Sequence, residues 1–135
     1  MELKLQQIMS EEYRVLNALY ESLLEQNKYL LSREVFSLDR IVKVIEAKSK
    51  DVANLEIERR KITKDRSMRE VIKEFKDKEL ENSYNTIVEL LDKLKFQKDT
   101  NEMLIKQSLG FTNQMLRAIN PGVGAKTYNA FGKSR

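Results

Sequence analysis

Residues 9–30 read MSEEYRVLNALYESLLEQNKYL, and this stretch decides the fold class. Large apolar residues recur in it at intervals of seven: Met9, Leu16, Leu23 and Leu30. Tyr13 and Tyr20 follow the first two of these residues by four positions, which completes the spacing of a coiled-coil-like helix with one apolar stripe. The stretch therefore predicts a long amphipathic helix over about residues 3–31.

A second apolar stripe with a new register follows the first. Its residues are Leu38, Ile41, Ile45, Val52, Leu55 and Ile62. Lys48 and Arg59 occupy intervening positions, where their long stems can cover apolar surface while the charged groups stay in water. We expect a helix over about residues 34–63, with Ser32 as its N-cap, antiparallel to the first helix because the connection is so short.

A short polar connector comes next, and a third long periodic run follows it. Ser67 and Glu70 have the spacing of a capping box, which predicts a brief helix at about residues 67–76. Apolar residues then recur to Ile119, with a polar step at residues 97–102. The third long helix is expected at about residues 79–119.

The distribution of glycine and proline supports this interpretation. The first glycine is Gly110 and the only proline is Pro121, while Ala, Glu, Lys, Leu and Arg make up 63 of the 135 residues. We expect an all-α protein: an antiparallel bundle or hairpin of three long helices with a short connecting helix. Residues 1–119 would form a single helical domain, and residues 120–135 a flexible tail that contains aromatic residues.

The composition argues against enzymatic chemistry. The chain has no cysteine and no histidine, so it lacks thiol nucleophiles, the usual general base and the commonest metal ligands. We expect no catalytic residue, no metal and no cofactor. The longest apolar runs have two or three residues and the N-terminus lacks a signal-peptide core, so we expect no membrane insertion and a cytoplasmic location.

The net charge of +4 is concentrated in one block. Residues 59–78 hold nine basic and four acidic residues, whereas residues 1–58 carry an acidic excess. A basic block can bind nucleic acid, but this one contains Phe75 as its single aromatic residue and no nucleic-acid motif. We favour a solvated helix end and connector, and expect no nucleic-acid partner.

Three stretches of the chain resemble the FlgN-type flagellar export chaperones. The first runs from Leu30 to Leu38 and leads into the second stripe; the second is Gln97-x-x-x-Asn101-x-x-Leu104-Ile105. The third is Thr127-Tyr128 ahead of Gly132. The resemblance covers essentially the whole chain and implies a small cytoplasmic helical chaperone. Such a protein escorts hook-associated proteins of the FlgK or FlgL type to the flagellar type III export gate.

Two sets of residues are candidates for partner binding. A client helix could lie in a groove on the apolar residues of the last helical stretch: Leu104, Ile105, Leu109, Phe111, Met115, Leu116 and Ile119. Core packing and self-association are equally compatible with these residues. In the tail, the resemblance implies docking to the export gate through an aromatic residue, either Tyr128 or Phe131. The alternative is a tail whose aromatic residues have no such role.

A different class of function also fits the pattern. The same apolar surface could join copies of the chain into a non-enzymatic coiled-coil scaffold. A chaperone would leave that surface available to its client, whereas a scaffold would bury it against itself.

Overall fold

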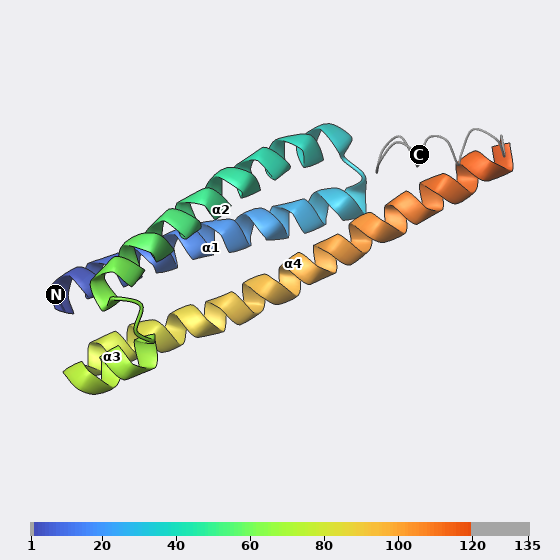
Figure 1. Cartoon of the computed structure of the whole chain (residues 1–135). Coiled ribbons are helices and arrows are strands. Elements are labelled where there is room, and N and C mark those ends of the chain that lie inside the picture. Colours follow the sequence, from blue (N-terminus) through green and yellow to red (C-terminus); the bar gives the residue numbers. More distant parts are fainter. Residues whose placement is uncertain (1, 120–135) are drawn as a thin grey trace. The chain divides into compact units, whose positions relative to one another are not determined.

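The computed structural model describes residues 2–119, except for the side chains of residues 111 and 112. It contains four helices: α1 (Glu2–Ser32), α2 (Val35–Thr63), α3 (Met68–Phe75) and α4 (Lys78–Ile119) (Figure 1). No strand occurs in this described part, so the prediction of an all-α fold is confirmed. The chain divides into two compact units, residues 1–99 and residues 100–135, which are described separately below.

Helices α1 and α2 form the antiparallel hairpin that the two apolar stripes predicted (Figure 1). Arg33 takes a left-handed conformation with φ 57°, and the Glu34 N–H donates to the carbonyl oxygen of Tyr29 at 3.0 Å. These two features end α1 and reverse the chain, because a left-handed residue cannot continue a right-handed helix.

The expectation that Ser32 caps α2 is wrong. Ser32 is the last residue of α1, and its hydroxyl donates to the carbonyl oxygen of Lys28 at 3.0 Å. Glu34 occupies the N-cap position of α2 and makes no side-chain capping hydrogen bond. The serine hydroxyl satisfies an open carbonyl at the end of α1, so it does not serve the start of the next helix.

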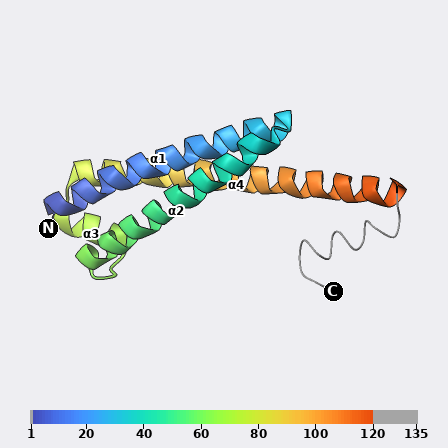
Figure 2. The ribbon, with the colours of Figure 1, turned by 90° about the horizontal axis from the view of Figure 1, so that it is seen from above.

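The core of the first unit joins three helices. In Figures 1 and 2 the first part of α4 runs beside α1, and α3 lies next to the start of α4. The buried cluster comes from all three: Leu5, Met9, Leu16, Met68, Val71, Ile72, Leu80, Ile87 and Leu90. Val52 and Ile62 of α2 pack against this cluster and are partly buried. The short helix α3 is therefore part of the core, although a connector was expected at this position.

Side-chain caps mark the starts of α3 and α4. The side chain of Ser67 accepts a hydrogen bond from the Glu70 N–H at 3.3 Å, so the Ser67 half of the predicted capping box is confirmed. Asp77 Oδ1 accepts from the N–H groups of Glu79 and Leu80, at 3.0 and 3.3 Å, at the start of α4. Each cap satisfies N–H groups that the helix itself leaves without a partner.

Helix α4 remains helical through residues 97–102, the polar step in the sequence. The boundary between the two compact units lies inside this step, after Asp99. The expectation of one domain over residues 1–119 stays a prediction.

Candidate functional site

The last stretch of α4, residues 104–119, brings the predicted client-binding residues onto one side of a helix. At about 100° per residue, the seven positions from Leu104 to Ile119 fall within an arc of roughly 160°. Gln107 and Gln114 lie on the opposite side of the helix. The stretch thus has one broad apolar face, which also contains the polar residues Ser108 and Thr112.

Most of the described side chains on this face are accessible to solvent. Ile105, Leu109, Met115 and Ile119 are exposed, and Ile119 retains 77% of its surface. Leu104 and Leu116 are partly buried. Within the second unit, residues 100–119 form a single helical stretch, and a single helix cannot enclose a core. Its apolar face is therefore suited to binding another surface.

Three of the predicted site residues cannot be placed in the same way. Phe111 belongs to α4, but its side chain is not among those described. Tyr128 and Phe131 lie outside the described residues, and so does the predicted tail at residues 120–135. Their roles stay predictions.

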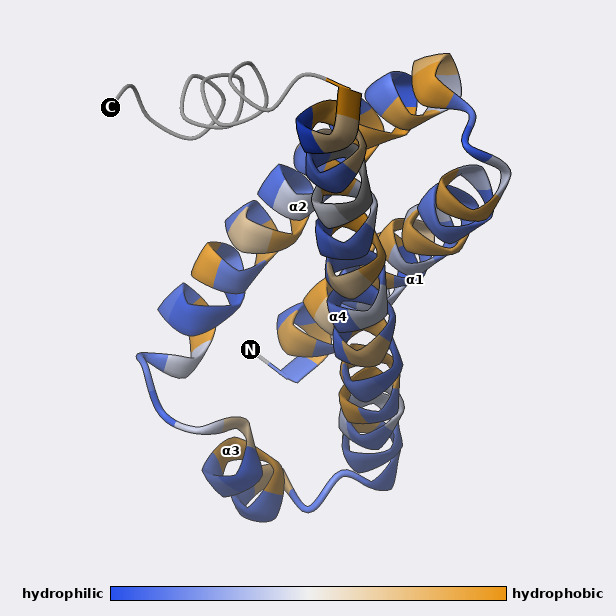
Figure 3. Cartoon of the chain, turned by 90° about the vertical axis from the view of Figure 1, so that its right-hand side faces the viewer, coloured by the Kyte–Doolittle hydropathy of each residue, from blue (hydrophilic) through white to orange (hydrophobic). Residues whose placement is uncertain are grey.

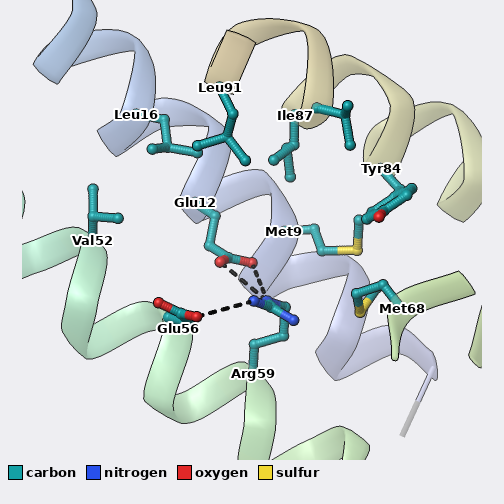
Figure 4. Close-up of a pocket in the computed structure, with 11 residues that line it drawn as sticks. Met9, Glu12, Leu16, Val52, Glu56, Arg59, Met68, Tyr84, Ile87 and Leu91 are labelled. Carbon is teal, nitrogen blue, oxygen red and sulfur yellow. Dashed lines mark hydrogen bonds and ion pairs between the residues drawn. The ribbon is translucent and has the colours of Figure 1, made fainter. Parts of the chain in front are cut away.

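The first unit contains an open cavity of about 470 Å³ (Figure 4). Its lining is mostly apolar and comes from all four helices of the unit, including Met9 and Leu16 of α1, Val52 of α2, Met68 of α3 and Ile87 of α4. One polar cluster interrupts this lining: Glu12, Glu56 and Arg59. The cavity is large enough for a ligand or for the side chains of a partner helix.

The polar cluster joins α1 to α2 through a buried carboxylate. Arg59 Nε donates to a Glu12 carboxylate oxygen at 3.2 Å, and the Arg59 guanidinium also lies 4.0 Å from Glu56 (Figure 4). Glu56 in turn accepts from Arg60 at 2.8 Å. Burial raises the pKa of Glu12, because it disfavours the charged carboxylate, and the positive charge of Arg59 opposes this shift.

The position of Arg59 was predicted from the sequence, but its partner Glu12 was not. Arg59 was placed in the second apolar stripe as a stem that covers apolar surface, and the structure finds it partly buried there. Glu12 lies three residues after Met9 and four before Leu16, so its position within the first stripe indicated that it would be buried. Two opposite charges at stripe positions of adjacent helices were the available signal for this ion pair.

A second exposed apolar group lies at the turn between α1 and α2, where no binding residue was predicted. It comprises Leu31, Val35 and Phe36, and Phe36 retains 88% of its surface. Figure 3 shows apolar residues, in orange, at the start of α2 beside the hydrophilic turn. The residues fall in the Leu30–Leu38 stretch that resembles the FlgN-type chaperones.

The described residues offer little for catalysis. Within residues 2–119, no three metal-ligating side chains gather closely enough to hold an ion. The buried carboxylate of Glu12 is held by its ion pair with Arg59. None of the helices described combines the length and the apolar character of a membrane span. The described helices instead present exposed apolar surfaces.

Comparison with protein families identifies the family of this chain. The model of the FlgN protein family matches residues 1–135, the whole chain. The chain belongs to the FlgN family, whose members are chaperones of flagellar export and assembly. Comparison with curated proteins and with solved structures gave no match.

Proposed function

We propose that this protein is a cytoplasmic chaperone that binds hook-associated proteins of the FlgK or FlgL type. It prevents their premature aggregation or assembly and delivers them to the flagellar type III export apparatus. The observation that carries the proposal is the FlgN family match over the whole chain, together with the exposed apolar face of residues 104–119.

The proposed binding mode is burial of an amphipathic client helix on that face. Leu109 and Leu116 are seven residues apart, which is two turns of helix, and they lie near the same edge of the face. At about 25 cal/mol per Å², covering roughly 300 Å² of apolar surface contributes about 7 kcal/mol before the costs of ordering. The affinity for the client is the part of this gain that remains after the costs of association and ordering.

The client surface is tested by substituting Leu109→Asp together with Leu116→Asp. A charge on each residue must be desolvated when the client helix binds, so capture of the C-terminal region of a hook-associated protein should fall at least about tenfold. The measurement is a pull-down with purified full-length chaperone, and circular dichroism checks that helicity is kept.

Gln107→Asp together with Gln114→Asp is the matched control for this test. It adds the same charge at the same spacing on the same stretch of helix, but on the opposite side. This variant should capture the client as well as the wild type does. Equal capture by all three proteins, or equal loss in both variants, would contradict the proposed face.

In the same proposal, the tail docks the loaded chaperone to the cytoplasmic part of the export gate. Tyr128 or Phe131 supplies the aromatic anchor, because a single buried ring can provide a large part of a small interface. Tyr128→Ala and Phe131→Ala are made separately. Substitution of the residue that docks should weaken binding to the gate and leave client capture intact. Loss of client capture in the same variant would refute this division of roles.

Self-association through residues 104–119 is the competing function. Sedimentation of the full chain over a range of concentrations distinguishes a chaperone from a self-associating scaffold. A monomer that is independent of concentration supports the chaperone, whereas a stable oligomer that Leu109→Asp with Leu116→Asp disrupts supports a coiled-coil scaffold.

A further inference from the structure

The groove between α3 and the start of α4 is lined by more positively than negatively charged side chains. It has a volume of about 660 Å³ and lies within the first unit, away from the proposed client face in sequence. Its lining includes three cations and one carboxylate: Arg69, Lys73, Lys76 and Glu81. The groove is therefore strongly cationic, although the charge of the whole chain is only +4.

The three cations form a row along α3 and its C-cap, and all of them line the groove. Arg69 and Lys73 lie one turn apart on α3, about 40° from each other in projection, and Lys76 follows as the left-handed C-cap residue of the helix. All three are exposed, whereas Val71 on the other side of α3 and Ile72 beside the cations are buried in the core. Because the core holds α3 in this orientation, the row of cations is fixed at the rim of the groove.

None of these three cations has a counter-ion among the residues that the structure describes. Neighbouring charges of the same basic block do have partners: Arg66 pairs with Glu74, and Lys78 pairs with Glu81 at 3.3 Å. Glu81, the one carboxylate of the groove, is thus already engaged. These three cations are not simply part of the net positive charge of the basic block, because all three line the same groove.

The floor of the groove, meaning its lining apart from the four charged residues, is mostly apolar but includes the polar Asn85. Ile72, Tyr84 and Val88 contribute to it, and Val88 keeps 37% of its surface exposed. A row of cations above an apolar floor matches an amphipathic helix with carboxylates on one side and apolar side chains on the other. Such a helix would place its carboxylates against α3 and its apolar residues against α4.

The geometry points to this groove as a docking site for an acidic amphipathic segment of a partner protein, separate from the client face and the tail. A protein segment fits better than nucleic acid, because three cations over about 10 Å can contact only a few phosphates and an apolar floor adds nothing to phosphate binding. It also fits better than a flat anionic membrane, since a flat surface cannot reach the floor of a concave groove. The site does not depend on the function proposed above.

The test measures the binding of a designed peptide to the full-length protein. The probe is a fluorescein-labelled helical peptide with Glu at i, i+4 and i+7 and Leu on the adjoining face, followed by fluorescence anisotropy. The groove variant combines Arg69→Gln, Lys73→Gln and Lys76→Asn. Asn is chosen at the last position because Lys76 has φ 53°, a left-handed conformation that Asn tolerates.

The control variant removes the same charge elsewhere in the first unit, with Lys28→Gln, Lys50→Gln and Lys95→Gln, which are all exposed. The groove variant should bind the peptide about tenfold more weakly than the wild type, because it loses three ion pairs. The control variant should stay within about twofold of the wild type. Val88→Asp should also weaken binding, and this separates docking in the groove from attraction by charge alone.

Three results would overturn the proposal. The first is no binding of the peptide to the wild type at about 1 mM. The second is an equal loss of binding in the groove and control variants. The third is that the groove variant loses binding to a single-stranded DNA 20-mer, or to vesicles of phosphatidylserine and phosphatidylcholine, while it keeps the peptide. Pull-down of the hook-associated protein is measured in parallel, so failure of this site is distinguishable from failure of the client face.

Discussion

At the residue scale, the ion pair of Glu12 and Arg59 shows how one buried charge can specify a contact without giving much stability. Glu12 is 7% exposed, and burial raises its pKa despite the nearby guanidinium. The raised pKa means that the attraction of Arg59 does not fully offset the loss of hydration of the carboxylate. The pair fixes which turn of α2 faces which turn of α1.

The raised pKa of Glu12 gives a pH dependence with a definite sign. Between the ordinary carboxyl pKa of 4.5 and the higher folded value, the folded state binds more protons than the unfolded state. The free energy of unfolding contributed by Glu12 therefore falls as the pH rises through this window. Glu12→Gln removes the titration.

Urea unfolding of both proteins at about pH 4.5 and about pH 7 tests this sign. The wild type should gain stability relative to Glu12→Gln when the pH is lowered. The other carboxyl groups titrate in both proteins, so their contributions cancel in the comparison. A relative gain for the wild type as the pH rises would mean that the ion pair outweighs the burial.

At the element scale, different interactions stabilise α3 and the last stretch of α4 as helices. Helix α3 has only eight residues, but it has a serine cap and places Val71 and Ile72 in the core. Among the described residues of its own unit, the last stretch of α4 has neither of these supports and depends on its intrinsic propensity. Gly110 is a weak point in that stretch, since glycine is among the poorest helix formers.

Gly110→Ala should therefore stabilise the end of α4. A Cβ at this position meets nothing within 4 Å, so the substitution gains about 1 kcal/mol of helix propensity without a clash. Amide exchange of residues 106–114 should slow by up to about fivefold.

Gly110→Ala also tests which side of α4 the client contacts. Gly110 lies on the side opposite to Leu104 and Leu116 on a helical projection, so capture of the hook-associated protein should not change. Faster exchange would indicate strain in the helix at this position. Lost capture with slower exchange would indicate that the client approaches Gly110.

At the scale of the whole molecule, the division into two units predicts unequal protection from hydrogen exchange. Amides of α1 and of residues 80–94 lie on helices that contribute to the buried cluster of the first unit. Residues 103–119 lie in a unit whose described part has no core of its own. Local opening should therefore be easier there, because fewer buried contacts must be broken.

Hydrogen exchange on the full-length chain, resolved by peptide, measures this difference. Exchange from residues 103–119 should be faster than exchange from α1 by at least about tenfold. Equal protection along residues 1–119 would instead support the single cooperative domain that the sequence predicts. The comparison should be repeated with the bound client, which is expected to slow exchange on the proposed face.

The sequence by itself determined the helices, because helical periodicity and the absence of glycine and proline over 109 residues are local properties of the chain. It also placed Arg59 in a stripe and Ser67 at a cap, since each depends on neighbours within a few positions. Only the tertiary structure decided which distant residues meet. Glu12 and Arg59 are 47 residues apart, and their pairing depends on the register of the hairpin.

The cationic groove shows the same limit. The sequence contained Arg69, Lys73 and Lys76 within a basic block that was expected to be a solvated connector. Packing of Val71 and Ile72 into the core oriented α3, and that orientation set the three cations beside the apolar floor from α4. A run of charged residues forms a specific surface only when the core fixes the orientation of its helix. That core is made by residues that are far apart in the chain.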